Sequence, residues 1–182
     1  MLLTPALAYE REFLGSGLFH LGPSGALFRT EVFRELGGFP VIPHASDYLF
    51  WIRACARVNV LLVSGDLFYY RIHPRQEAAK PENDLAYAHS AAEAWRMLNA
   101  EQCPLTGAAL VRAKRNFAFT QARGMYRHLK HRRVASALAV LKYCGLGVLD
   151  WMRYLRTPRR HATAGTPVDH ASACLEKAGG KS

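Results

Sequence analysis

The sequence predicts an α/β, helix-rich fold in which a short region containing strands precedes a longer run of helices. Three observations support this prediction. Half of the 182 residues are apolar, enough to build a real core. β-rich runs occur at residues 58–63 and 67–72, separated by the turn Ser64-Gly65-Asp66. From Leu85 onward, apolar residues recur at helical spacing instead.

The first 40 residues contain signals for two short helices. Pro5 suits a helix start, and apolar residues follow it at Leu7, Tyr9, Phe13 and Leu14. The turn at residues 22–25 leads into an apolar run at residues 26–28, which we expect to form a strand. Arg29 and Thr30 then open a second helix, with Thr30 as a candidate cap and with Phe33 and Leu36 facing inward. Gly37-Gly38 ends this helix where positive φ is needed.

A third helix is predicted to begin at Ser46 or Asp47, because Tyr48, Trp51, Ile52 and Cys55 follow at helical spacing. The later helices are predicted from apolar stripes and from turn residues such as Cys103-Pro104. We expect them near residues 85–102, 106–129 and 134–155.

Four pieces of sequence occur in a recognisable order: GPSGALFR, GGF, an Asp-led DYLFWIR and the β-run ending in YRIH. Together they resemble the second half of a family-2 glycosyltransferase domain of the GT-A (nucleotide-diphospho-sugar transferase) type. The resemblance covers about residues 5–77. It implies a partial GT-A-like domain at residues 1–77, followed by a C-terminal helical segment at 78–156 and a predicted disordered tail at 157–182.

The family's nucleotide-binding half ends in an Asp-x-Asp metal motif, and this chain contains no such motif. Its aspartates are far apart, at Asp47, Asp66, Asp84, Asp150 and Asp169. We therefore expect either a fragment of a longer enzyme, whose donor-binding half would precede Met1, or a catalytically inactive remnant.

The resemblance implies transfer of a sugar, with inversion, from a nucleotide-sugar donor to a hydroxyl acceptor. In this scheme Asp47 is the catalytic base, because a carboxylate is ionised at neutral pH and can accept the acceptor's proton. The alternative is that Asp47 only caps its helix.

The resemblance also implies a divalent metal, Mg²⁺ or Mn²⁺, on the donor diphosphate, with His73 as a ligand. Equally, His73 could bond a loop at a strand end. Arg71 could neutralise the leaving phosphate or pair with an acidic residue. Trp51 is a candidate substrate contact or a core residue, and the small turn at Ser24-Gly25 would let the backbone approach a substrate closely.

The chain carries a formal net charge of +10, and the charge is uneven. No acidic residue lies between Gln102 and Leu149, whereas nine Lys and Arg do. A solvated helix face, an interfacial helix on an anionic membrane, and nucleic-acid binding are three interpretations of this segment. No reader motif for nucleic acid occurs, so we do not expect that partner.

Four widely spaced cysteines without a CxxC pair suggest reduced, partly buried thiols rather than a zinc site or disulfides. The N-terminus lacks the pattern of a signal peptide, and no apolar run is long enough to span a membrane. We expect a cytoplasmic protein that is peripheral on the inner face of the membrane. Its predicted function is that of a glycosyltransferase fragment, with an inactive remnant acting as a membrane-surface or interaction module as the alternative. A basic nucleic-acid-binding protein is a third alternative.

Overall fold

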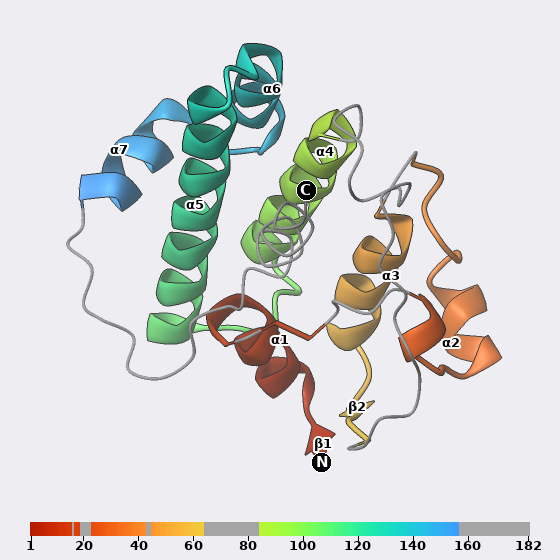
Figure 1. Ribbon diagram of the computed structural model, residues 1–182. Helices are drawn as coiled ribbons and strands as arrows, with labels where there is room; N and C mark the ends of the chain where they lie inside the picture. Colours follow the sequence, from red (N-terminus) through yellow and green to blue (C-terminus); the bar gives the residue numbers. More distant parts are fainter. Residues whose placement is uncertain (16, 19–22, 43–44, 64–83, 157–182) are drawn as a thin grey trace, which may run out of the picture.

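The computed structural model describes residues 1–15, 17–18, 23–42, 45–63 and 84–156, and these form a helix-rich structure with one small sheet (Figure 1). A 3₁₀ turn spans Pro23–Gly25. The α-helices are α1 (Pro5–Leu14), α2 (Thr30–Glu35), α3 (Ser46–Cys55), α4 (Asp84–Asn99), α5 (Gly107–Lys130), α6 (Val134–Tyr143) and α7 (Val148–Arg156).

The sheet is smaller than the sequence predicts. Strand β1 (Leu2–Leu3) pairs antiparallel with β2 (Val60–Leu61), and the described residues contain no other strand. Residues 26–28 do not form the expected strand, and the ring of Phe28 packs against aromatic neighbours instead. The predicted strand at residues 67–72 lies outside the described residues, as do the predicted domain boundary at residue 77 and the predicted tail.

Helix α1 joins the start of the chain to α3 and α5. The Thr4 hydroxyl accepts a hydrogen bond from the N–H of Leu7 at 3.5 Å, so Thr4 caps the helix as Pro5 begins it. The hydroxyl of buried Tyr9 donates to the Ile52 carbonyl at 3.1 Å, and burial raises the pKa of Tyr9 above its ordinary value. At the end of α1, the Asn116 side chain donates to the Phe13 carbonyl at 3.0 Å.

The main hydrophobic core lies among α1, α3, α4, α5 and α6. Trp95 of α4 stacks on Phe117 of α5 with ring centroids 5.6 Å apart. Ile52 of α3 and Val140 of α6 are buried in the same core. Helix α4 packs against α3 on one side and against α5 and α6 on the other (Figure 1). The first 63 residues and the later helices therefore share one core.

The prediction of a single helix at residues 134–155 is wrong, because a turn separates α6 from α7. Gly145 has a φ of +77°, a conformation that side chains rarely adopt. A Cβ at this position would lie 2.9 Å from Cδ1 of Trp95 and 3.4 Å from the backbone of Ala92. The break thus lets the α6–α7 turn pack directly against α4.

Substitution Gly145→Ala should lower the free energy of unfolding by about 1–3 kcal/mol, because it adds backbone strain and a clash with Trp95. Gly124→Ala is the matched control, since Gly124 lies inside α5 and a Cβ there would meet nothing within 4 Å. It should raise stability by up to about 1 kcal/mol. Urea denaturation of both variants tests this, and equal stability of the Gly145→Ala variant and the parent would contradict it.

Candidate functional site

Asp47 lies in the first turn of α3, two residues after the N-cap Ala45. Its side chain is half-buried, and Oδ1 accepts a hydrogen bond from the N–H of Tyr48 at 2.8 Å. That N–H is one of the amides at a helix start that have no partner within the helix. Asp47 therefore supports the helix start as predicted, although the cap position itself belongs to Ala45.

The backbone just before Asp47 is strained. Ala45 has a φ of +58°, in the left-handed region that a residue with a Cβ rarely occupies. Such a conformation costs on the order of 1 kcal/mol and persists where the surrounding structure requires it. The strained residue lies directly before the first turn of α3.

Around α2 and α3, five aromatic side chains form an aromatic cluster that is separate from the main core. Neighbouring rings have centroids 5.1–6.5 Å apart. Its members are Phe28, Phe33, Phe39, Phe50 and Trp51. The cluster joins the segment before α2, α2 itself, the turn after it and α3 into one unit.

The predicted site residues are only partly grouped. Asp47 and Trp51 lie one turn apart and therefore share one side of α3. Trp51 is 6% exposed inside the aromatic cluster, whereas Ser24 and Gly25 are exposed on the turn that leads to Phe28. Arg71 and His73 lie outside the described residues.

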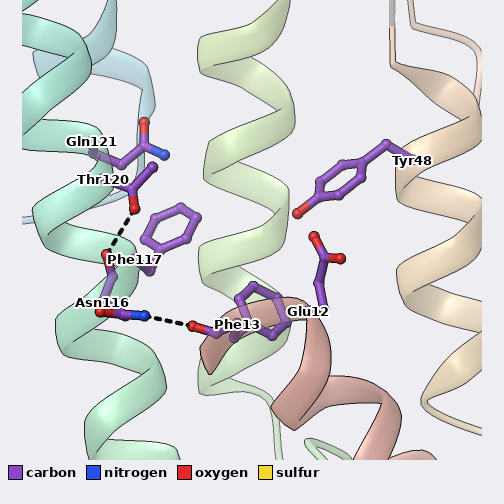
Figure 2. A pocket seen from close by; sticks show the side chains of 7 residues that line it. All are labelled: Glu12, Phe13, Tyr48, Asn116, Phe117, Thr120 and Gln121. Atoms are coloured by element: carbon purple, nitrogen blue, oxygen red, sulfur yellow. Dashed lines mark hydrogen bonds between the residues drawn. The ribbon is translucent and has the colours of Figure 1, made fainter. Parts of the chain in front are cut away.

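A second polar feature is a cavity of about 160 Å³ among α1, α3 and α5 (Figure 2). Its lining comprises Glu12, Phe13, Tyr48, Asn116, Phe117, Thr120 and Gln121. The amide of Asn116 and the hydroxyl of Thr120 already donate to backbone carbonyls, those of Phe13 and Asn116, each at 3.0 Å. The cavity has room for a few water molecules, and Asp47 is not among its described lining residues.

Tyr48 points into this cavity toward Glu12 (Figure 2). Burial, and then the negative charge of Glu12, raise the pKa of Tyr48 well above its ordinary value. The hydroxyl therefore stays protonated at neutral pH. It can donate a hydrogen bond there, but it cannot act as a general base.

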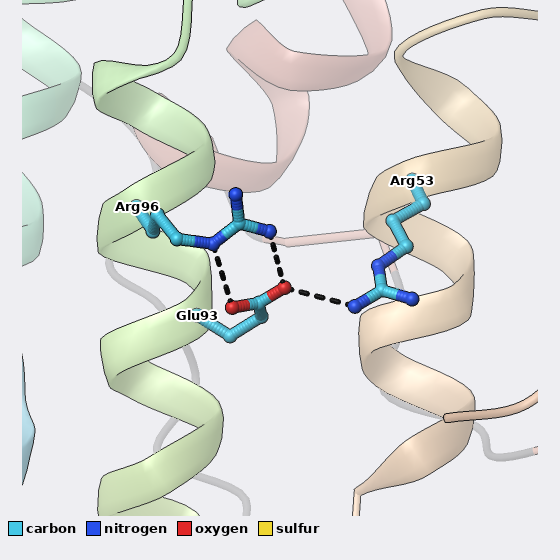
Figure 3. Close-up of polar contacts among 3 residues, drawn as sticks. All are labelled: Arg53, Glu93 and Arg96. Atoms are coloured by element: carbon cyan, nitrogen blue, oxygen red, sulfur yellow. Dashed lines mark hydrogen bonds and ion pairs between the residues drawn. The ribbon is translucent and has the colours of Figure 1, made fainter. Parts of the chain in front are cut away.

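Helix α3 is also tied to α4 by an ion group (Figure 3). Glu93 accepts two hydrogen bonds from Arg96, at 2.9 and 2.6 Å, and one from Arg53 at 2.9 Å. The hydrogen bonds from Arg96 and then from Arg53 lower the pKa of Glu93 to about 2, against the opposing effect of burial. Arg53, the last residue of the DYLFWIR piece, thus has a structural role in orienting α3.

Substitution Glu93→Gln should lower the free energy of unfolding at pH 7 by about 1–2 kcal/mol, a value reduced because Arg96 is 66% exposed. The folded-state pKa lies below that of an unfolded Glu, about 4.3. The stabilisation is therefore complete above about pH 5 and is lost as the pH falls toward 2.

Denaturation at several pH values tests this expectation, with exposed Glu101→Gln as the control. The stability difference between parent and Glu93→Gln should shrink below about pH 4. A difference that stays constant from pH 7 to pH 3 would show that the charge of Glu93 does not stabilise the α3–α4 contact.

In the described part of the chain, no group of three His, Cys, Asp or Glu residues could hold a metal ion. Asp47 alone does not fit a divalent cation, which takes about six oxygen ligands. The metal implied by the resemblance stays a prediction.

Sequence reasoning missed Glu12 and Glu93, which interact with Tyr48 and Arg53 of α3, and Asn116, which ties α5 to α1. The Glu93–Arg96 spacing of three is a readable helical pair. The contacts of Asn116 with Phe13 and of Arg53 with Glu93 join positions 103 and 40 residues apart, and no local pattern predicts them.

Comparisons with protein-family models, with curated proteins and with solved structures found no match to this chain. None of the helices in the described residues combines the length and apolarity needed to cross a bilayer. Function therefore has to be inferred from the residues themselves.

Proposed function

We propose that this chain is the acceptor-side part of an inverting glycosyltransferase in which Asp47 is the catalytic base. The observation that supports the proposal is the aromatic cluster. Three of the four pieces that carry the resemblance, GPSGALFR, GGF and DYLFWIR, each contribute a ring to it. These separate pieces of the sequence are thereby packed into one unit with α3, the helix that carries Asp47 in its first turn.

The position of Asp47 suits the removal of a proton from an acceptor hydroxyl. The carboxylate uses Oδ1 to accept the N–H of Tyr48, which fixes the side chain at the start of α3. Oδ2 would then accept the proton while the acceptor oxygen attacks the anomeric carbon. The nucleoside diphosphate leaves from the opposite face, which inverts the anomeric configuration.

Donor binding is assigned to a separate half, because the chain has no Asp-x-Asp motif. As the resemblance implies, Arg71 would bind the leaving diphosphate and His73 would be a ligand of its Mg²⁺ or Mn²⁺. Ser24 and Gly25 supply an exposed turn for the substrate. Trp51 shapes the floor of the acceptor side from within the aromatic cluster.

The chain by itself should not bind nucleotide sugars tightly, since the carboxylate pair that holds the metal–diphosphate is missing. Titration calorimetry with UDP- and GDP-sugars, with and without Mn²⁺, is the measurement. A dissociation constant in the micromolar range would contradict the assignment of this chain to the acceptor side alone.

In an enzyme that joins this chain to a donor-binding half, Asp47→Asn should reduce the transfer rate by about 10²- to 10⁴-fold. The amide keeps an oxygen that can accept the N–H of Tyr48, so stability should change by no more than about 1 kcal/mol. Donor affinity should stay the same. The measurement is turnover of folded enzyme at saturating donor.

Glu31→Gln is the matched control, because Glu31 is an exposed acidic residue in the first turn of α2. It shares the helix-start environment but lies outside the proposed site, so its rate should equal that of the parent. Turnover of Asp47→Asn within a few-fold of the parent would remove Asp47 as the base and leave it only a role at the helix start.

A further inference from the structure

Helix α6 is apolar on two adjacent sides. Ala137 and Val140 are buried where α6 packs against α4 and α5. On the other side, Val134, Leu138 and Leu141 are 56%, 58% and 45% exposed. The spacing of four and then three residues places these three side chains in one line, here called the outer stripe. So wide an apolar face is normally covered, yet the described residues leave the outer stripe open.

The exposure of large apolar side chains continues in α7. Val148, Leu149 and Met152 are 72%, 76% and 41% exposed, while Trp151 faces the core. Scattered exposed apolar residues are ordinary on a protein surface, but three in line on one helix are typical of a surface that contacts something apolar.

Positive charge borders the outer stripe at both ends. Arg132 is exposed just before α6, and exposed Lys142 lies one turn after Leu138, on the same side of the helix. Between Gln102 and Leu149 the chain has nine Lys and Arg and no acidic residue. The charge of Arg132 and Lys142 beside the outer stripe favours a partner that is both apolar and anionic.

The backbone at Arg132 supports a role for its charge. Helix α5 ends in a turn in which the N–H groups of Arg132 and Arg133 bond the carbonyls of Leu129 and His128, at 2.9 and 2.8 Å. This turn puts its central residue in the left-handed region, where glycine is the usual residue. Arg132 has a φ of +57° there, so a cation occupies a position that glycine would occupy with less strain.

We propose that α6 docks on the surface of an anionic lipid bilayer. The outer stripe lies at the boundary between headgroups and acyl chains, and Arg132 and Lys142 contact lipid phosphates on either side of it. A second copy of the chain fits less well, because two faces with this charge would repel. The proposal is independent of the proposed glycosyltransferase activity.

The test is co-sedimentation of the whole chain with phosphatidylcholine vesicles that contain or lack phosphatidylglycerol. Binding should require the anionic lipid and should weaken as salt rises from about 0.1 M to about 0.5 M, because salt screens the attraction. Substitution R132Q/K142Q should weaken binding by about 25-fold, taking about five-fold for each basic residue near the surface. The control R34Q/R57Q removes two exposed cations from α2 and the segment after α3, and it should bind like the parent.

The apolar contribution needs its own variants. L138S/L141S keeps every charge and should weaken binding on the order of ten-fold or more. V41S/L61S is its control, because Val41 and Leu61 are 104% and 67% exposed and β2 lies far from α6 (Figure 1). Circular dichroism checks that all variants are folded. In addition, a tryptophan placed by Leu138→Trp should shift its emission to the blue with anionic vesicles and not with neutral ones.

Three results would overturn the proposal. The first is absence of binding to anionic vesicles. The second is binding that L138S/L141S leaves unchanged, which would reduce the interaction to unspecific attraction of a basic surface. The third is a dimer, seen by ultracentrifugation without lipid, that L138S/L141S dissociates, because a second copy would then cover the outer stripe.

Discussion

The burial of α3 on two sides is the constraint on which the rest of the described structure depends. Ile52 and Cys55 face the main core, whereas Phe50 and Trp51 face the aromatic cluster. Each fully buried side chain of this size contributes about 1.5–3 kcal/mol, so burial on both sides stabilises the position of α3. The hydrogen bond from Tyr9 to the Ile52 carbonyl and the ion pair between Arg53 and Glu93 then fix its rotation. A helix held in this way can keep a half-buried carboxylate in one place at its start.

The same constraint explains which features the sequence predicts. Helix positions follow from apolar spacing, which is local. Helices α1 and α3 begin where the sequence predicts, and α4 and α5 begin and end close to their predicted bounds. The Gly37-Gly38 stop is also local, and both residues have the expected positive φ. By contrast, the residues at 58–63 have strong β propensity, yet strand β2 contains only Val60 and Leu61, because the strand beside it is the short β1. Leu62 adds two hydrogen bonds to Met1 beyond the strand. The length of a strand depends on the strand that pairs with it, and β propensity gives no information about that partner strand.

The turn between α6 and α7 shows that apolar spacing, too, does not determine where a helix ends. Apolar residues continue at helical spacing through residues 134–155, so the pattern alone predicts one helix. Helix α6 ends at Tyr143, and the turn at Gly145 packs against Trp95 and Ala92, about 50 residues earlier in the sequence. The start of α3 also differs from the local pattern. Ala45 rather than Ser46 holds the cap position, and it adopts a conformation unusual for alanine. For the candidate site, local spacing was enough to place Asp47 and Trp51 on one side of α3, but not to show that Trp51 is buried.

The distribution of charge is a further departure from what stability alone would favour. Arg123, Arg127 and Lys130 follow one another at spacings of four and three on α5, where like charges oppose helix formation by a few tenths of a kcal/mol per pair. The chain does use an acidic residue to offset such repulsion elsewhere, since Glu93 lies between Arg53 and Arg96. It places none between Gln102 and Leu149. In the proposal that α6 docks on an anionic bilayer, the lipid headgroups would supply the compensating negative charge and the acyl chains an apolar environment for the outer stripe.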